Sequence, residues 1–153
     1  MKHYKDEKNN IFAYESDGSQ DAFIKEGLVP ISDEDLAAMI APTTEQLLSQ
    51  LSAARKEQER QGVVINGIRY AGDPGNRQTL QEAITYIEDA GLAEFPSWKD
   101  SDGVFHQNNP LADVKDAARA IGARRSQLIA AEGEYAAQII AGTLTDLTEV
   151  VWP

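Results

Sequence analysis

The chain has 153 residues, of which 42% are hydrophobic and 25% are charged, so we expect a globular protein of one ordinary domain or two very small ones. It carries 25 acidic residues against 14 Lys and Arg, a formal net charge of -11, and no long basic run, which argues against non-specific binding to nucleic acid or to an anionic membrane. The absence of cysteine excludes disulfides, thiolate metal sites and cysteine nucleophiles.

The first residues, MKHYKDEKNN, lack the apolar core of a signal peptide. No apolar run approaches the length that spans a membrane. We therefore expect the protein to be made and kept in a cytoplasm, with the exception that a protein without a signal can still leave a cell inside a larger particle.

Residues 4–15 predict a β-hairpin. Strand-forming residues lie on both sides of DEKNN, and these turn residues tolerate positive φ. The segment AFIKEGLVPIS that follows is apolar but is interrupted by Gly27 and Pro30. We expect extended or turn-like backbone there.

Two helices are predicted next. Ser32 and the three acids after it are typical of a helix N-terminus, and Pro42 stops this short helix. A second helix begins at Thr43 or Thr44 and ends at Gly62. Its apolar stripe gives way to RKEQERQ, which is polar all round, and this pattern is typical of a solvated spacer between two packed bodies.

The segment after this helix contains the strongest local signal in the sequence. VVINGIRY predicts a hairpin with a type I′ turn at Asn66 and Gly67. Asp73 and Pro74 then start a helix, which Gly91 closes.

The remaining residues predict a second hairpin and a long helix. KDSDG supplies the hairpin turn, and the helix covers about residues 111–141, where Gly122 and Gly133 each weaken it by about 1 kcal/mol relative to Ala. The end of the chain, TLTDLTEVVWP, is expected to be extended. Because an apolar aromatic side chain at a free end is costly to leave in water, we expect Trp152 to dock on something.

These elements predict an α+β protein in three parts. Residues 1–42 form a small β-hairpin head, residues 43–62 form a connecting helix, and residues 63–153 form a hairpin, helix, hairpin and long helix with an extended tail. A homodimer through the long helix stays open, although its two glycines, Arg125 and Glu132 make a clean coiled coil a poor expectation.

No pattern in the chain predicts catalysis, a cofactor or a metal site. DSDG resembles the start of a calcium loop, but its glycine comes too early and the closing acid is missing, so a hairpin turn explains it better. His3 and His106 are not at a metal-ligand spacing, and GDPGN lacks the Lys-Ser/Thr of a phosphate-binding loop. We therefore expect a protein that binds and does not act as an enzyme.

Arg55–Lys56 and Arg124–Arg125 are the densest basic spots. In the long helix, Arg124 and Arg125 interrupt the apolar stripe, as does Glu132. A solvated or partly paired position explains them, and a contact site for an acidic partner is the alternative.

The N-terminal region has the layout of a known protein family. Its elements are a lysine-aromatic strand, a turn, a YE-type strand, an aromatic-Ile segment, and GL-PI-DE leading to a helix and a proline: Tyr4, Phe12, Tyr14, Phe23, Ile24, Gly27, Leu28, Pro30, Ile31, Asp33, Glu34 and Pro42. In these residues the chain resembles caudoviral (bacteriophage) tail fibre assembly proteins, and its TEVVWP ending is similar to the end of many of them.

The region from about Val63 to Ala141 resembles a domain of unknown function found in phage tail proteins. The pattern is an NG hairpin, an aspartate, a helix, a W-D-G hairpin and a long Ala-rich helix, and the matching residues are Asn66, Gly67, Tyr70, Asp73, Leu80, Ala83, Trp98, Asp100 and Gly103.

The resemblance implies an assembly chaperone in the host cytoplasm that helps a trimeric tail fibre protein, at its receptor-binding distal end, to fold and trimerise. Some members of the family stay on the fibre tip in the virion, so an adaptor or tip protein retained in the tail is the alternative. The candidate contact residues are Phe12, Tyr14, Phe23, Ile24 and Trp152.

Overall fold

The structure, a computed structural model, describes residues 1–153 and divides into two compact units, Met1–Pro42 and Thr43–Pro153. Its helices and small antiparallel sheets form an α+β fold, which confirms the predicted fold class. None of the helices combines the length and the apolar character needed to span a bilayer.

The first unit is built on a three-stranded antiparallel sheet in the order β2-β1-β3. Its elements are β1 (Lys2–Lys5), β2 (Ile11–Tyr14), a single 3-10 turn η1 (Asp21–Phe23), β3 (Val29–Ile31) and α1 (Asp33–Ile40). The predicted hairpin is β1–β2, in which Tyr4 lies opposite Phe12. The segment expected to be extended or turn-like supplies both η1 and β3.

Helix α1 begins where the sequence predicts. The Ser32 hydroxyl accepts a hydrogen bond from the backbone N–H of Asp35 at 3.0 Å and donates one to the Asp35 carboxylate at 2.7 Å. This N-cap satisfies one of the free amide groups of the first turn. The helix ends at Ile40, two residues before Pro42.

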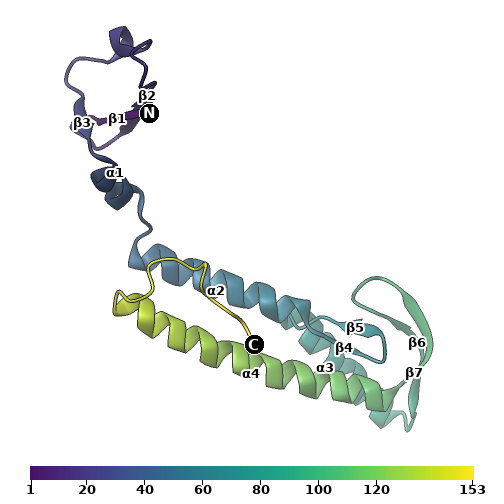
Figure 1. The fold of residues 1–153 in the computed structure, drawn as a ribbon. Helices are drawn as coiled ribbons and strands as arrows, with labels where there is room; N and C mark the ends of the chain where they lie inside the picture. Colours follow the sequence, from purple (N-terminus) through teal and green to yellow (C-terminus); the bar gives the residue numbers. More distant parts are fainter. The chain divides into compact units, whose positions relative to one another are not determined.

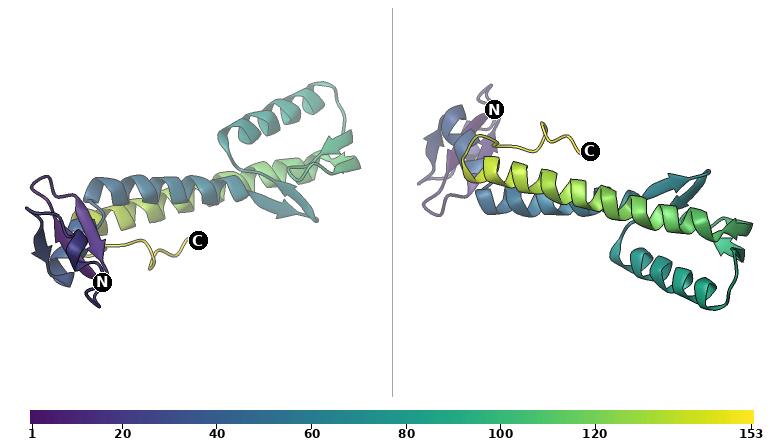
Figure 2. Two further views of the ribbon diagram at one scale, coloured as in Figure 1. Left: turned by 90° about the horizontal axis from the view of Figure 1, so that it is seen from above. Right: turned by 90° about the horizontal axis from the view of Figure 1, so that it is seen from below.

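The second unit contains three helices and two hairpins. Its elements are α2 (Thr44–Gln61), β4 (Val63–Ile65), β5 (Ile68–Tyr70), α3 (Pro74–Asp89), β6 (Glu94–Lys99), β7 (Phe105–Pro110) and α4 (Leu111–Ile140). Helix α2 lies along the C-terminal half of α4, and α3 and the hairpins lie beside its N-terminal half (Figures 1 and 2). The long helix thus joins two packing regions.

Each half of α4 contributes to a separate apolar core. The first core joins α3, both hairpins and the start of α4: Tyr70, Leu80, Ile84, Ile87, Phe95, Val114, Ala117 and Ile121. The second joins α2, the end of α4 and the C-terminal tail: Leu47, Leu51, Ile139 and Leu144. Leu128 is also fully buried on α4.

The polar second half of α2 is packed against its neighbours, so α2 does not stand alone as a spacer. Arg55 pairs with Glu59 on the same helix and with Glu132 on α4, and Glu59 also pairs with Arg77 on α3. Glu59 is only 7% exposed. Arg55 and Glu59 of the polar run therefore face charged side chains of other helices in the same unit, a pairing that the sequence pattern alone cannot show.

Two turns after α2 depend on positive φ. Asn66 (φ 50°) and Gly67 (φ 82°) both have the sign that a type I′ turn requires, which confirms the predicted β4–β5 hairpin. Gly62 (φ 70°) ends α2, and a Cβ atom there would lie 1.9 Å from the backbone oxygen of Tyr70. Only glycine lets the end of β5 approach α2 so closely.

Candidate functional site

The first unit has no buried side chain. A sheet of this size normally covers one face with a core, and a domain near 40 residues rarely buries enough apolar area to be stable alone. Large apolar side chains remain exposed instead: Met1, Ile11, Phe23, Val29 and Ile40. The unit therefore leaves these apolar side chains uncovered, and we call the five of them together the head patch.

Two predicted contact residues lie on β2. Phe12 and Tyr14 are half-buried and alternate with the exposed Ile11 and Ala13, so they share one face of the strand. The ring of Tyr14 meets that of Tyr4 edge-on at 5.6 Å between centroids. Tyr14 is thus partly occupied by a contact within the sheet, and Phe12 by Lys25, whose Nζ lies 5.8 Å from the centroid of its ring.

Two further predicted contact residues lie at the 3-10 turn. Phe23 is 72% exposed, whereas Ile24 is half-buried. The ion pair between Lys2 and Asp21, at 2.7 Å, ties this turn to β1. Phe23 is consequently the member of the predicted set most available to a partner.

The edges of the head sheet are open. In the order β2-β1-β3, the outer edges of β2 and β3 have no strand beside them. Pro30 in β3 lies opposite Tyr4 and cannot donate a backbone hydrogen bond, which makes β3 a poor template for further pairing. The outer edge of β2 therefore offers the better set of backbone groups for an added strand.

Trp152 belongs to the second unit and is occupied there. Its ring meets that of Tyr135 on α4 at 6.2 Å between centroids, and it packs beside the second core. The Tyr135 hydroxyl accepts a hydrogen bond from the Val151 N–H at 3.1 Å and donates one to the Val151 oxygen at 3.2 Å. The predicted docking of this side chain is thus found within its own unit.

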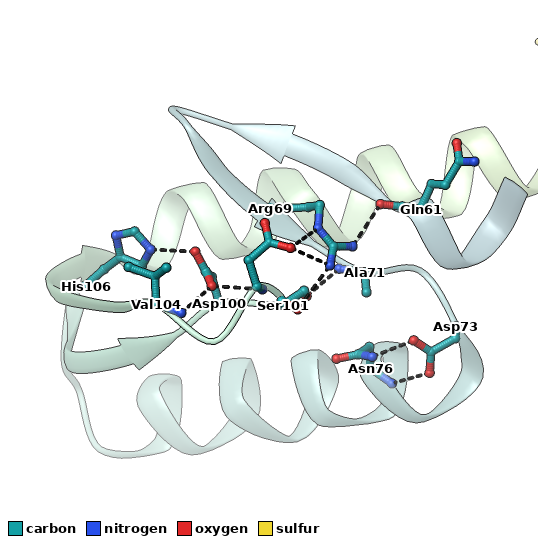
Figure 3. A network of polar contacts seen from close by, with 10 residues as sticks. Gln61, Arg69, Ala71, Asp73, Asn76, Asp100, Ser101, Val104 and His106 are labelled. Atoms are coloured by element: carbon teal, nitrogen blue, oxygen red, sulfur yellow. Dashed lines mark hydrogen bonds and ion pairs between the residues drawn. The ribbon is translucent and has the colours of Figure 1, made fainter. Parts of the chain in front are cut away.

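A polar network joins the two hairpins of the second unit (Figure 3). Arg69 on β5 donates hydrogen bonds to the Asp102 carboxylate at 2.8 Å, to the backbone oxygen of Ser101 at 3.0 Å and to the backbone oxygen of Gln61 at 3.3 Å. The Ser101 hydroxyl accepts from the Ala71 N–H at 2.7 Å. These contacts hold the β6–β7 turn against the end of β5.

The acid at the start of that turn is also fully engaged. Asp100 lies 2.7 Å from His106 and accepts hydrogen bonds from the backbone N–H groups of Asp102 and Val104. The hydrogen bond with His106, followed by those two N–H groups, lowers the pKa of Asp100 below its ordinary 3.8. Ser101 bonds to Ala71, and His106 to Asp100, so they do not form a nucleophile–base pair.

A cluster of ion pairs around the buried Glu59 is the feature that sequence reasoning missed. Glu59 is contacted by Arg55 from α2, Arg77 from α3 and Arg125 from α4. The four-residue spacing of Arg55 and Glu59 on one helix was the only local signal, because such residues share a helix face. The other two contacts join segments far apart in the sequence.

The clusters of His, Asp and Glu in the chain do not include one arranged to hold a metal ion. The chemistry available in the head patch is burial of apolar groups and backbone hydrogen bonding. The chemistry available around Glu59 is binding of a charged group through the ion pairs of the arginines there.

Comparison with known protein families gives a match for the second unit. A family model described as Domain of unknown function (DUF4376) matches residues 42–151, which is most of the chain. The chain belongs to this family. No curated protein and no solved structure matches it.

The DUF4376 match has nearly the same limits as the second compact unit, Thr43–Pro153. It includes α2, so the family domain begins about twenty residues earlier than the resemblance from Val63 implies. The head patch lies outside the match. The two units therefore differ in packing, and the family match covers only the second.

Proposed function

We propose that the chain is a bacteriophage tail fibre assembly chaperone, which binds a tail fibre protein near its receptor-binding distal end and assists its folding and trimerisation. The first unit carries the resemblance to the assembly proteins. The observation that carries the proposal is that this unit leaves five large apolar side chains, those of the head patch, uncovered and its β2 edge open.

The physical need for such a protein follows from the fibre. Folding intermediates of trimeric, β-rich chains expose strand edges and apolar patches that aggregate. An acidic protein with an open strand and exposed apolar side chains can cover those surfaces until the trimer closes. This role requires no bond to be made or broken, and we propose no catalytic step and no cofactor.

Co-expression tests this proposal directly. A candidate tail fibre protein is produced with and without this chain, and the soluble trimer is quantified by gel filtration and by its resistance to detergent. We expect a several-fold rise in soluble trimer. An unchanged yield would count against the chaperone function.

A matched pair of variants tests whether the chaperone activity depends on the head patch. Phe23→Ser removes the most exposed aromatic side chain of the first unit, and Tyr86→Ser removes one of similar exposure (68%) from the second unit. We expect the yield to fall with Phe23→Ser and to stay with Tyr86→Ser. The reverse result would move the contact surface to the DUF4376 unit.

The second candidate function is a structural adaptor or tip protein retained in the virion tail. It uses the same head patch but differs in lifetime on the fibre. Mass spectrometry of purified particles separates the two, because a transient chaperone is absent from particles and an adaptor is present in a fixed ratio to the fibre.

A further inference from the structure

The two basic spots of the sequence meet in the fold. Arg55 and Lys56 on α2 and Arg125 on α4 line one cavity of about 550 Å³, together with Arg60 and Arg77. Helices α2 and α4 lie side by side in all views (Figures 1 and 2), which is why residues about 70 positions apart share this cavity. An acidic chain thus concentrates cations at one place.

Glu59 neutralises only part of this charge. Its Oε1 contacts Arg55 and lies 3.3 Å from Nε of Arg125, while its Oε2 lies 3.3 Å from Nη1 of Arg77. Arg55 is balanced further by Glu132, whose Oε2 lies 2.5 Å from its Nε. One buried carboxylate is therefore shared by three guanidinium groups.

The cavity retains a surplus of positive charge. Its lining holds five cationic side chains and three carboxylates, those of Glu57, Glu59 and Asp73, a surplus of two charges. Glu132, which pairs with Arg55 but does not line the cavity, reduces the surplus to one. Asp73 caps the N-terminus of α3 with its own carboxylate, so the helix end adds little to the attraction.

Two of the cations have unused binding capacity. Lys56 forms no ion pair, and Arg125 pairs only with Glu59. Arg125 is 45% exposed, so its guanidinium is accessible from solvent while one nitrogen remains against Glu59. A guanidinium offers several N–H donors in one plane, a geometry that matches the oxygens of a carboxylate or a phosphate.

We propose that this cavity is an oxyanion-binding site in which Arg125 and Lys56 supply the free donors and Arg77 adds positive charge. The ligand class is a carboxylate or a phosphate-type group. The overall charge of -11 opposes the approach of an anion. At physiological salt, however, that field is screened beyond about 8 Å, so the local surplus decides binding inside the cavity. This site is independent of the proposed action on tail fibres.

Anion titration of the full chain tests the proposal. Thermal unfolding is followed as acetate, phosphate or sulfate replaces chloride at constant ionic strength, and binding is read in parallel from the arginine Nε–H signals by heteronuclear NMR. We expect a saturable stabilisation together with a shift of the Arg125 signal. A response to acetate alone identifies a carboxylate site, and a response to phosphate and sulfate alone identifies a phosphate-type site.

Matched variants separate the site from a general salt effect. Arg125→Gln should weaken binding by about tenfold or more, because it removes charge-assisted hydrogen bonds. Arg119→Gln on the same helix, where Arg119 is 74% exposed and paired with Asp116, should leave binding unchanged. If Arg125→Gln does not fold, Lys56→Gln replaces it. Equal responses in all variants, or no saturable response to any of the three anions, would overturn the proposal.

Discussion

The two units contain hairpin turns built on the same chemistry. In the first unit Asp6 accepts hydrogen bonds from the backbone N–H groups of Lys8 and Asn10. In the second, Asp100 accepts from the residues at the same two offsets, Asp102 and Val104. The third residue after each aspartate has positive φ, 61° at an asparagine and 86° at a glycine. Local sequence is therefore enough to define either turn.

The surroundings of the two hairpins differ completely. The β6–β7 hairpin buries Phe95, whose ring lies 4.9 Å from that of Trp98, and its Asn109 exchanges hydrogen bonds with the buried Tyr70. The β1–β2 hairpin buries no side chain. Turn chemistry thus specifies a hairpin, whereas its stability depends on what packs against it.

The largest predicted difference comes from removing one leucine in each unit. Leu51 is 1% exposed in the second core, and Leu51→Ala should lower the free energy of unfolding by about 2–5 kcal/mol. Leu28 in the first unit is only half-buried, so Leu28→Ala should cost less than about 1 kcal/mol. Urea unfolding followed by circular dichroism measures both. Equal costs would mean that the first unit has a core after all.

Charge pairing provides the next test. Glu59→Gln keeps the shape of the side chain but leaves Arg55 and Arg77 without their shared counter-charge in a buried place, so we expect a loss of about 3 kcal/mol. Glu57→Gln on the same helix is the control, because Glu57 pairs with Arg60 in solvent. It should change the urea midpoint very little.

The first unit offers the corresponding exposed pair. Asp21→Asn breaks the contact with Lys2, and both side chains are well exposed to water. We expect a minor change in its unfolding, measured by hydrogen exchange of the β1 amides. A large loss of protection would show that this surface pair, and not the packing of side chains, holds the first unit together.

The destabilisation caused by replacing a glycine of positive φ with alanine should also differ between the two units. Gly62→Ala should cost about 3 kcal/mol, because strained φ costs about 1–3 kcal/mol and the added Cβ would meet the Tyr70 oxygen at 1.9 Å. Gly27→Ala has the same sign of φ, 88°, but nothing lies within 4 Å of the new atom. We expect only the strain of about 1 kcal/mol there. Thermal unfolding of the two variants gives the difference.

Sequence reasoning succeeded wherever a signal was local. Ser32 and Thr43 cap helices, Asn66 and Gly67 form the predicted turn, and Gly91 follows the end of α3 with φ of 67°. Each of these depends on the conformational or hydrogen-bonding preference of one or two residues. The α+β class followed from their order along the chain.

The features that escaped prediction depend on contacts between distant segments. RKEQERQ is polar in sequence, yet Glu59 within it is buried because Arg77 and Arg125 reach it from other helices. The sequence also marked Phe23 and Trp152 alike as candidate contacts. Trp152 instead packs on Tyr135, a partner 17 positions earlier that no local pattern identifies. Of the head patch, only Phe23 was among the predicted contact residues, and its use by a partner stays a prediction.

Replacing a glycine inside α4 with alanine should increase the stability of the second unit. Gly122 is exposed, and nothing lies within 4 Å of a Cβ placed there. Gly122→Ala should raise the free energy of unfolding by about 1 kcal/mol, because alanine loses less backbone entropy in a helix. The gain should appear as a higher urea midpoint of the second unit. No gain would indicate that α4 is distorted at this position.

The loss of stability at low pH tests what the aspartate of each of the two related turns, Asp6 and Asp100, contributes to the stability of its own unit. Hydrogen bonds lower the pKa of both carboxylates below 3.8, from the side chain of Asn10 first for Asp6 and from His106 first for Asp100. A lowered folded-state pKa stabilises the fold above the unfolded value, and this contribution is lost as the pH falls below about 4. Asp6→Asn and Asp100→Asn, which retain an acceptor oxygen, should therefore each flatten this acid-induced loss.

The two variants should differ in where the flattening is seen. NMR signals of β1 report the first unit and those of α4 report the second. We expect Asp6→Asn to act on the first set and Asp100→Asn on the second, because each carboxylate stabilises the hairpin in which it lies. If a variant left its own unit as sensitive to acid as before, the carboxylate would not contribute to the stability of that unit. Other contacts would then hold the turn, because protonation of the carboxylate would not shift the folding equilibrium.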